Sequence, residues 1–244
     1  MTQQARGYQP VQRNKGHESG SQPLPMEGPY VQLAIPPQPG KGSHSPIAFL
    51  DRDGVINKGK PGYVNGPDEV VLLEGAATVI GDLNRAGYLV CVVTNQSPIA
   101  RGLWGPDSLQ AIHGELQQQL HLLDPKADIN VFLTCPHRFE DRCSCRKPSP
   151  GMLFLGHRLL RESDGFEVNL QPMTHAIPTP DVDWWGERPI GPHTLDIMVG
   201  DRRSDMGAGW AFGARLYRVH ASVGLQAIGT QWMDQADRGE PFQP

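Results

Sequence analysis

The sequence predicts an α/β protein in which helices cover both faces of a parallel β-sheet. The first reason is that short apolar runs alternate along the chain with segments of helical period, in the order that parallel strands require. The second reason is that every apolar run ends in a polar loop. The expected strands are residues 47–50, 88–93, 129–133 and 195–199, and the expected helices are residues 76–85, 108–123 and 152–160.

The polar loops after the expected strands predict where a functional site lies. In a parallel sheet, ligands collect beyond the carboxyl ends of the strands. The loops in question begin at residues 51–54, 94–96, 134–137 and 200–202. We therefore expect these four loops to converge on one crevice.

Four regions are expected along the chain. Residues 1–45 are rich in proline, glycine, serine and glutamine without a sustained period, so we expect a flexible tail, in which residues 36–39 alternatively form a polyproline segment for a partner. Residues 46–220 form the folded domain. An insertion at residues 162–194 has little periodicity and is either a functional flap or disordered. Residues 221–244 form a C-terminal extension with peripheral packing.

Composition excludes several classes of protein. The chain has 244 residues with 26 acidic and 22 basic side chains, a formal net charge of −4, and therefore no broad basic field for nucleic acid. Its longest interior apolar run is far below the roughly 20 residues that cross a bilayer, and its polar start has no signal-peptide core. We expect a cytoplasmic protein that binds neither nucleic acid nor membrane, and the sequence indicates no oligomeric state.

The pair Asp51 and Asp53 is the first candidate for chemistry. Residues two apart at a strand end project to the same side at a spacing of about 7 Å, and Gly54 lets the chain turn away. Asp51 is suited to attack phosphorus, and Asp53 to protonate the leaving oxygen and then to deprotonate water. The alternative is an ordinary acidic pair in a loop.

The remaining loops supply what a carboxylate needs in order to attack a phosphate dianion. Thr94 offers a hydroxyl beside main-chain amides, and Lys147 offers a cation. Asp201 offers a hard oxygen ligand for Mg²⁺, together with Asp51 and the main-chain carbonyl of Asp53. Each residue alone has an ordinary structural explanation, but the set in this order indicates phosphoryl transfer.

Residues 51–57, 94–97, 146–148 and 199–205 resemble the four signature motifs of the haloacid dehalogenase superfamily, and most closely those of the heptose bisphosphate phosphatases and the related histidinol-phosphate phosphatases. The resemblance implies a Rossmann-like sheet and a phosphatase. The implied catalytic residues are Asp51, Asp53, Thr94 and Lys147. The implied substrate-binding residues are Tyr63, Asn95, Gln96, Ser97, Arg146 and Arg202. The implied Mg²⁺ ligands are Asp51, Asp53 and Asp201, with Asp205 just outside them.

A second metal site is predicted by a cluster of cysteines. Three thiols and one imidazole within eleven residues suit tetrahedral Zn²⁺ with no open position, so we expect a structural zinc that holds the loop carrying Arg146 and Lys147. The expected ligands are Cys135, His137, Cys143 and Cys145. Cys91 is expected to be a buried apolar residue, and His113 and His121 to lie on helix surfaces.

The predicted substrate is a small phosphorylated metabolite, and D-glycero-D-manno-heptose 1,7-bisphosphate, which would lose its C7 phosphate, is the first choice. Histidinol phosphate is the alternative, because the short spacing inside the zinc loop resembles that group and Pro98 departs from the usual glycine. A non-catalytic phosphate-accepting or zinc-stabilised interaction module is a further alternative, although Asp53 argues against it, and a polynucleotide phosphatase is disfavoured by the acidic balance. Residues 57–87 are too few for a large cap domain. We hypothesise that the 162–194 insertion folds over the open site with Trp184 and Trp185.

Overall fold

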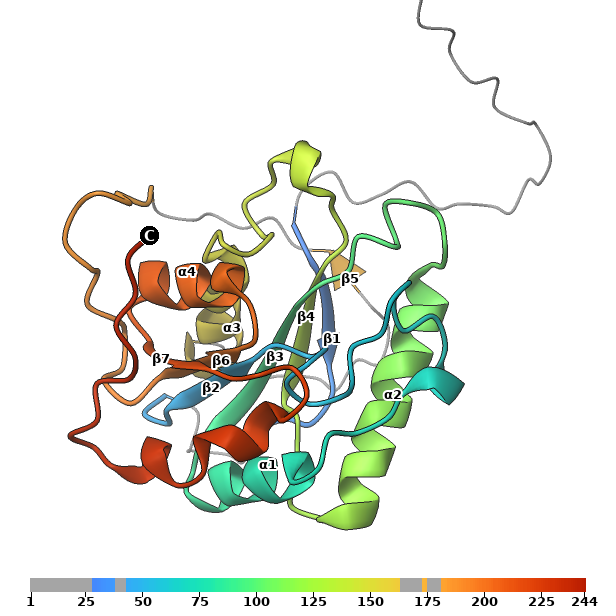
Figure 1. Ribbon diagram of the computed structural model, residues 1–244, viewed down its shortest axis with the longest axis horizontal. Coiled ribbons are helices and arrows are strands. Elements are labelled where there is room, and N and C mark those ends of the chain that lie inside the picture. Colours follow the sequence, from blue (N-terminus) through green and yellow to red (C-terminus); the bar gives the residue numbers. More distant parts are fainter. Residues whose placement is uncertain (1–27, 38–42, 163–172, 175–180) are drawn as a thin grey trace, which may run out of the picture.

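The computed structural model describes residues 28–37, 43–162, 173–174 and 181–244, and its centre is a seven-stranded sheet in the order β5-β1-β4-β3-β2-β6-β7 (Figure 1). The strands are β1 (Tyr30–Leu33), β2 (Ile47–Leu50), β3 (Leu89–Asn95), β4 (Val131–Cys135), β5 (Met173–Thr174), β6 (Ile197–Gly200) and β7 (Arg215–Arg218). The helices are α1 (Ala76–Arg85), α2 (Pro106–Leu123), α3 (Gly151–His157), which continues as a π-helical turn over Arg158–Glu162, and α4 (Arg203–Phe212). The predicted α/β class is confirmed.

The middle of the sheet is parallel, as predicted. β2 lies between β3 and β6, and the parallel pairing extends to β4 on one side and β7 on the other. Successive side chains of β2 alternate between two cores, with Ala48 and Leu50 in one and Ile47 and Phe49 in the other. Because both faces are buried, the carboxyl edge of the sheet is where the chain turns toward solvent, and Asp51 follows there.

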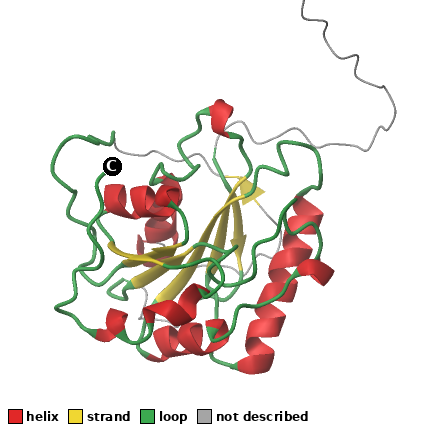
Figure 2. Ribbon diagram, in the orientation of Figure 1, coloured by secondary structure: helices red, strands yellow, loops and turns green. Residues whose placement is uncertain are grey.

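Two helical layers enclose the sheet. α1 and α2 cover one face, and α3 and α4 cover the other (Figure 2). α3 approaches β3 closely at Gly156, where an added Cβ would lie 2.8 Å from the Cys91 sulfur. Cys91 is fully buried as expected, and burial raises the pKa of its thiol. The expected surface position of His113 is wrong, because α2 buries this side chain against the sheet. No helix in the described part of the chain combines the length and apolar character needed to cross a membrane.

The expectation of a flexible tail is wrong for residues 30–33. These residues form β1, which is buried and runs antiparallel to β4, with Tyr30 opposite Thr134 and Leu33 opposite Val131. A four-residue strand is too short to reveal its period, and the neighbouring prolines concealed it further. Residues 38 and 39 of the polyproline hypothesis lie outside the described residues.

The C-terminal extension does more than pack peripherally. Short 3-10 helices at Gly224–Ile228 and Gln231–Met233 bring Leu225, Ile228 and Trp232 into the same core as α1 and α2. Arg215 is also buried and donates to the main-chain oxygens of Trp232, at 3.1 Å, and Asp234, at 3.0 Å. These contacts make the extension part of the folded domain.

Much of the predicted insertion, residues 163–172 and 175–180, lies outside the described residues. In the part that is described, Trp184 stacks on Trp210 near the end of α4, with ring centroids 5.9 Å apart, and Trp185 is 96% exposed. Neither tryptophan lines the cavities at the candidate site. The hypothesis that both shape access to the site therefore finds no support in the described contacts.

Candidate active site

The polar loops meet at the carboxyl edge of the sheet. Asp51 directly follows β2, Thr94 lies at the end of β3, and Asp201 directly follows β6. The loop after β4 adds Lys147, which reaches back to these strands. The convergence predicted from the sequence is therefore present.

Lys147 forms the electrostatic centre of the site. Its ammonium nitrogen lies 2.8 Å from Asp51 Oδ1 and 2.7 Å from Asp205 Oδ1, and it donates to the Val93 carbonyl oxygen at 2.7 Å. Burial raises the pKa of Asp51 to about 6, although the Lys147 charge acts in the opposite direction. For Lys147 itself, burial opposes the charged form, but Asp205 and Asp51 outweigh it and raise the pKa. Asp51 is thus a desolvated carboxylate with one fixed cation beside it.

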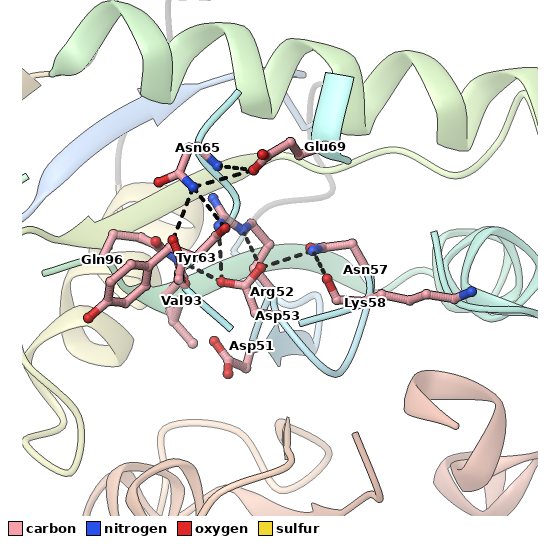
Figure 3. A network of polar contacts seen from close by, with 12 residues as sticks. Asp51, Arg52, Asp53, Asn57, Lys58, Tyr63, Asn65, Glu69, Val93 and Gln96 are labelled. Atoms are coloured by element: carbon pink, nitrogen blue, oxygen red, sulfur yellow. Dashed lines mark hydrogen bonds and ion pairs between the residues drawn. The ribbon is translucent and has the colours of Figure 1, made fainter. Parts of the chain in front are cut away.

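Asp53 is held by donors on both carboxylate oxygens (Figure 3). Oδ1 accepts from Arg52 Nε at 3.2 Å and Asn57 Nδ2 at 2.9 Å, and Oδ2 accepts from Arg52 Nη2 at 3.0 Å and Gln96 Nε2 at 2.8 Å. Burial alone would raise the pKa of Asp53, but the charge and hydrogen bonds of Arg52, with those of Asn57 and Gln96, lower it. The carboxylate is therefore ionised in this arrangement, with its acceptor positions occupied.

The end of β3 is joined to the loop that carries Lys147. The Asn95 side chain donates to the Lys147 carbonyl oxygen and accepts from the Lys147 amide, each at 3.1 Å. Gln96 Nε2 donates to Thr94 Oγ1 at 2.9 Å as well as to Asp53. Ser97 is buried at the start of the next turn. Asn95 consequently fixes the backbone position of Lys147.

Three carboxylates could hold a divalent cation. Asp51, Asp201 and Asp205 each place an oxygen within 4.8 Å of the others. Asp201 Oδ1 is buried without a hydrogen-bond partner among the described residues, and its ion pair with Arg202 Nε is long, at 3.8 Å. Burial together with the Asp51 charge raises the pKa of Asp201. Gly54, at φ 81°, is needed here, because a Cβ would lie 3.0 Å from Asp201 Oδ2. Crowded oxygen donors with an unsatisfied atom fit a hard ion such as Mg²⁺.

The predicted zinc ligands form a compact cluster. The sulfurs of Cys135, Cys143 and Cys145 lie 3.2 to 3.6 Å apart, and His137 Nδ1 lies 3.2 Å from Cys145 Sγ and 3.6 Å from Cys135 Sγ. A tetrahedral site with Zn–S bonds of about 2.3 Å has sulfur–sulfur edges of roughly 3.8 Å, close to this arrangement. The cluster therefore fits a closed zinc site. Arg146, directly after Cys145, donates to the His137 carbonyl oxygen at 2.9 Å.

Two cavities adjoin Asp53, and a third of about 480 Å³ adjoins Asp201 but neither Asp51 nor Asp53. The smaller of the two beside Asp53, of about 60 Å³, is lined by Asp51, Asp53, Tyr63, Thr94, Asn95, Lys147, Arg202, Ser204 and Asp205. The larger of these two, of about 290 Å³, is lined by Asp53, Gly54, Gly59, Lys60, Pro61, Tyr63, Val64, Asp201, Arg202 and Ala221. Tyr63 borders both and has a positive φ of 72°, a strained conformation that is frequent at functional sites. The structure thus brings most predicted residues together, whereas Gln96, Ser97 and Arg146 line neither cavity.

Three residues of the site were not predicted from the sequence. Arg52 and Asn57 are almost fully buried and bind Asp53, and Lys60, which lines the larger cavity, pairs with Glu69 at 2.6 Å. The position of Arg52 between two aspartates was a usable signal, since a buried carboxylate needs a counter-charge. The roles of Asn57 and Lys60 depend on how the loop folds.

Comparison with known proteins places the chain among phosphatases. No family model matches it. It is 32% identical over 182 residues to the D-glycero-beta-D-manno-heptose-1,7-bisphosphate 7-phosphatase of Pseudomonas putida, covering 75% of this chain and 86% of that enzyme. The chain belongs to this phosphatase family. The Bordetella bronchiseptica enzyme of the same name is 42% identical over 106 residues, which cover 43% of this chain and only 58% of the relative.

Other relatives are also named as heptose bisphosphate phosphatases, but some are named for the alpha anomer of the sugar and others for the beta anomer. A D-glycero-alpha-D-manno-heptose-1,7-bisphosphate 7-phosphatase of Mycobacterium tuberculosis is 33% identical over 167 residues, covering 68% of this chain and 72% of that one. Among solved structures, the B. bronchiseptica heptose bisphosphate phosphatase, complexed with magnesium and phosphate, has a TM-score of 0.56 at 28% identity, covering 80% of this chain and 89% of that one. A haloacid dehalogenase-like phosphatase from Mesorhizobium loti reaches 0.55 at 28% identity, covering 77% of each chain.

Proposed function

We propose that the chain is a Mg²⁺-dependent phosphomonoesterase that acts through a phosphorylated Asp51. The observation that carries the proposal is the position of Asp51. Its side chain is buried beside Lys147 and lies close enough to Asp201 for both carboxylates to bind one metal ion. Asp53 follows two residues later. A carboxylate in this setting is desolvated and faces a cation that offsets the approach of a phosphate dianion.

The reaction divides into two displacements. In the first, an Asp51 oxygen forms a bond to phosphorus while the ester bond breaks, and Asp53 gives its proton to the departing alkoxide. In the second, Asp53 removes a proton from water, the water oxygen bonds to phosphorus, and Asp51 leaves as a free carboxylate with inorganic phosphate as product. The bound phosphate raises the proton affinity of Asp53 by like-charge repulsion, and proton transfer requires one of its four hydrogen bonds to break.

The remaining groups stabilise charge on the phosphoryl oxygens. Lys147 supplies a buried cation, and the Thr94 hydroxyl with the Asn95 main-chain amide supplies hydrogen bonds. The Gln96 main-chain amide is not part of this set, because it donates to the Cys135 carbonyl oxygen at 2.7 Å. Asp51, Asp201 and the Asp53 carbonyl oxygen are the groups that would hold Mg²⁺, which when bound neutralises negative charge on the phosphoryl group. Asp205 is not one of these proposed metal ligands; it forms an ion pair with Lys147 and so positions the ammonium group.

The substrate we propose is D-glycero-D-manno-heptose 1,7-bisphosphate, which would lose its C7 phosphate. The names of the relatives support this choice, and the larger cavity has room beside the carboxylates for a sugar. Tyr63 and Arg202 border both cavities and are the proposed contacts of the sugar and its second phosphate. The relatives include enzymes named for each anomer, so both anomers belong in the test.

The test is phosphate release from a small panel, with Mg²⁺ present and then chelated. The panel contains both heptose bisphosphate anomers, histidinol phosphate and an end-phosphorylated oligonucleotide. Asp51→Asn and Asp53→Asn should each lose activity by at least about 100-fold, whereas Asp128→Asn, a change far along the chain from these motifs, should retain it. Mg²⁺-dependent turnover of histidinol phosphate alone would replace the proposed substrate. Wild-type protein that releases phosphate from none of them would indicate the non-catalytic interaction module instead.

A further inference from the structure

Arg52, which lies between Asp51 and Asp53 in the chain, contacts Asp53 but has no role in the proposed reaction. Arg52 is 0% exposed, and its guanidinium binds both carboxylate oxygens of Asp53 (Figure 3). A guanidinium presents its donors in a rigid plane, so a two-point contact fixes the orientation of the carboxylate as well as its charge. A single-point donor such as Asn57 does not restrict rotation in this way.

The other two donors to Asp53 are more easily released than Arg52. Gln96 and Asn57 each supply one hydrogen bond, and Gln96 has an alternative partner in Thr94 at 2.9 Å. Arg52 has no solvent-facing alternative, because its whole side chain is enclosed. When the hydrogen bond from Gln96 or Asn57 breaks so that an Asp53 oxygen can bind a proton, the carboxylate therefore stays bound to Arg52.

Arg52 also has His113 of α2 within electrostatic range, because its charge lowers the pKa of that ring. Its third nitrogen, Nη1, is buried without a hydrogen-bond partner among the described residues, and so is Nε2 of His113 on α2. The His113 ring stacks on Phe132, with centroids 4.2 Å apart and an interplanar angle of 11°, and its Nδ1 lies 2.8 Å from Gln32 Oε1 on β1. Burial and then the Arg52 charge lower the pKa of His113. The neutral ring with its hydrogen on Nδ1 has a lone pair on Nε2 that stabilises a nearby guanidinium.

We propose that Arg52 is a positioning residue for Asp53, and that the His113 ring, oriented by Gln32, assists by stabilising the guanidinium charge of Arg52. The arrangement holds the acid so that its proton lies on the path of the departing oxygen. This inference rests on the proposed function, since it assigns Asp53 the role of acid. It predicts that Arg52 matters most where the leaving oxygen needs a proton, as an alkoxide does, and least where it does not, as with p-nitrophenolate.

The test compares two leaving groups through kcat/KM, which reports the steps up to departure of the alcohol. With Mg²⁺ and both metal sites loaded, Arg52→Lys should lower kcat/KM for the sugar phosphate by about 10- to 100-fold and for p-nitrophenyl phosphate by less than about 3-fold. His113→Phe, which keeps a ring on Phe132, should show the same selectivity at a smaller size, about 5-fold on the sugar phosphate. The matched control is Arg161→Lys, an arginine whose side chain is 5% exposed and pairs with Asp196. It should show no selectivity between the two substrates.

Equal losses on both substrates for Arg52→Lys would overturn the proposal and leave Arg52 a purely structural role. If that variant fails to fold, His113→Phe decides, because it leaves every hydrogen bond to Asp53 in place. Failure of the proposed function is a separate result, since wild-type protein would then cleave neither substrate.

Discussion

Lys147→Met is the sharpest test of how charge is balanced in the site. Methionine keeps an unbranched apolar stem but removes the ammonium that contacts Asp51 at 2.8 Å and Asp205 at 2.7 Å. The two carboxylate side chains are 9% and 1% exposed, so water from the small adjoining cavity replaces the lost cation only in part. Breaking a buried pair in this way costs about 3 to 5 kcal/mol, a large share of the roughly 5 to 15 kcal/mol that stabilises a typical domain.

The magnitude can be measured by urea unfolding of metal-chelated protein followed by circular dichroism. Lys147→Met should lower the free energy of unfolding by about 3 to 5 kcal/mol and, in Mg²⁺, lower kcat by about 100- to 1000-fold. Adding Asp205→Asn removes one uncompensated charge, and an asparagine oxygen can still accept from the Arg202 amide, now bound by Asp205 at 2.9 Å. The double variant should therefore recover at least about 1 kcal/mol of stability without recovering activity.

Two results would refute this reasoning. One is an unfolding free energy for Lys147→Met within about 0.5 kcal/mol of wild type, which is the range of ordinary surface substitutions. The other is a double variant that is less stable than Lys147→Met, because the carboxylate of Asp205 would then not be the group left without a counter-charge.

Two further predictions concern the buried histidine and the zinc cluster. Because the pKa of His113 is lowered by burial while the unfolded chain binds a proton near pH 6.5, the contribution of His113 to stability should fall as pH drops from 7 to 5. Relative to wild type, His113→Phe should change the slope of stability against pH by up to about 1.4 kcal/mol per pH unit in urea titrations, and an unchanged slope would contradict a buried neutral ring. Cys143→Ser should lose bound zinc by elemental analysis and lose activity with it, whereas Cys91→Ala should keep its zinc; full zinc content in Cys143→Ser would contradict the assigned ligand set.

The sequence predicted the parts of the fold that local patterns specify. β2 and α1 have the predicted boundaries, because an apolar run that ends at Asp51 and a helical period that follows Gly75 are complete signals in themselves. The grouping of Asp51, Thr94 and Asp201 was also predictable, since each lies at or just beyond the carboxyl end of a strand and parallel strands end at one edge of the sheet. The zinc ligands were visible as spacing within eleven residues.

The features that the sequence did not reveal depend on partners far away in the chain. β1 is a strand because β4 pairs with it, and the isolated four residues carry no period. His113 was expected on a helix surface because histidine is polar, but Gln32 and Phe132 enclose it. Gln96 was expected to bind substrate, and its hydrogen bond to Asp53, at 2.8 Å, could not be read from the sequence. In each case the deciding contact is tertiary.

The pairing of β1 constrains how the chain can be made and manipulated. Tyr30 is opposite Thr134 in β4, so on the ribosome this strand must wait for about a hundred further residues before its partner is available. During that interval the main-chain amides and carbonyls of residues 30–33 have no β4 strand to pair with. A shortened chain that starts after residue 33 would expose the β4 edge and remove Gln32 from His113, so it should aggregate more readily than one that starts just before residue 28.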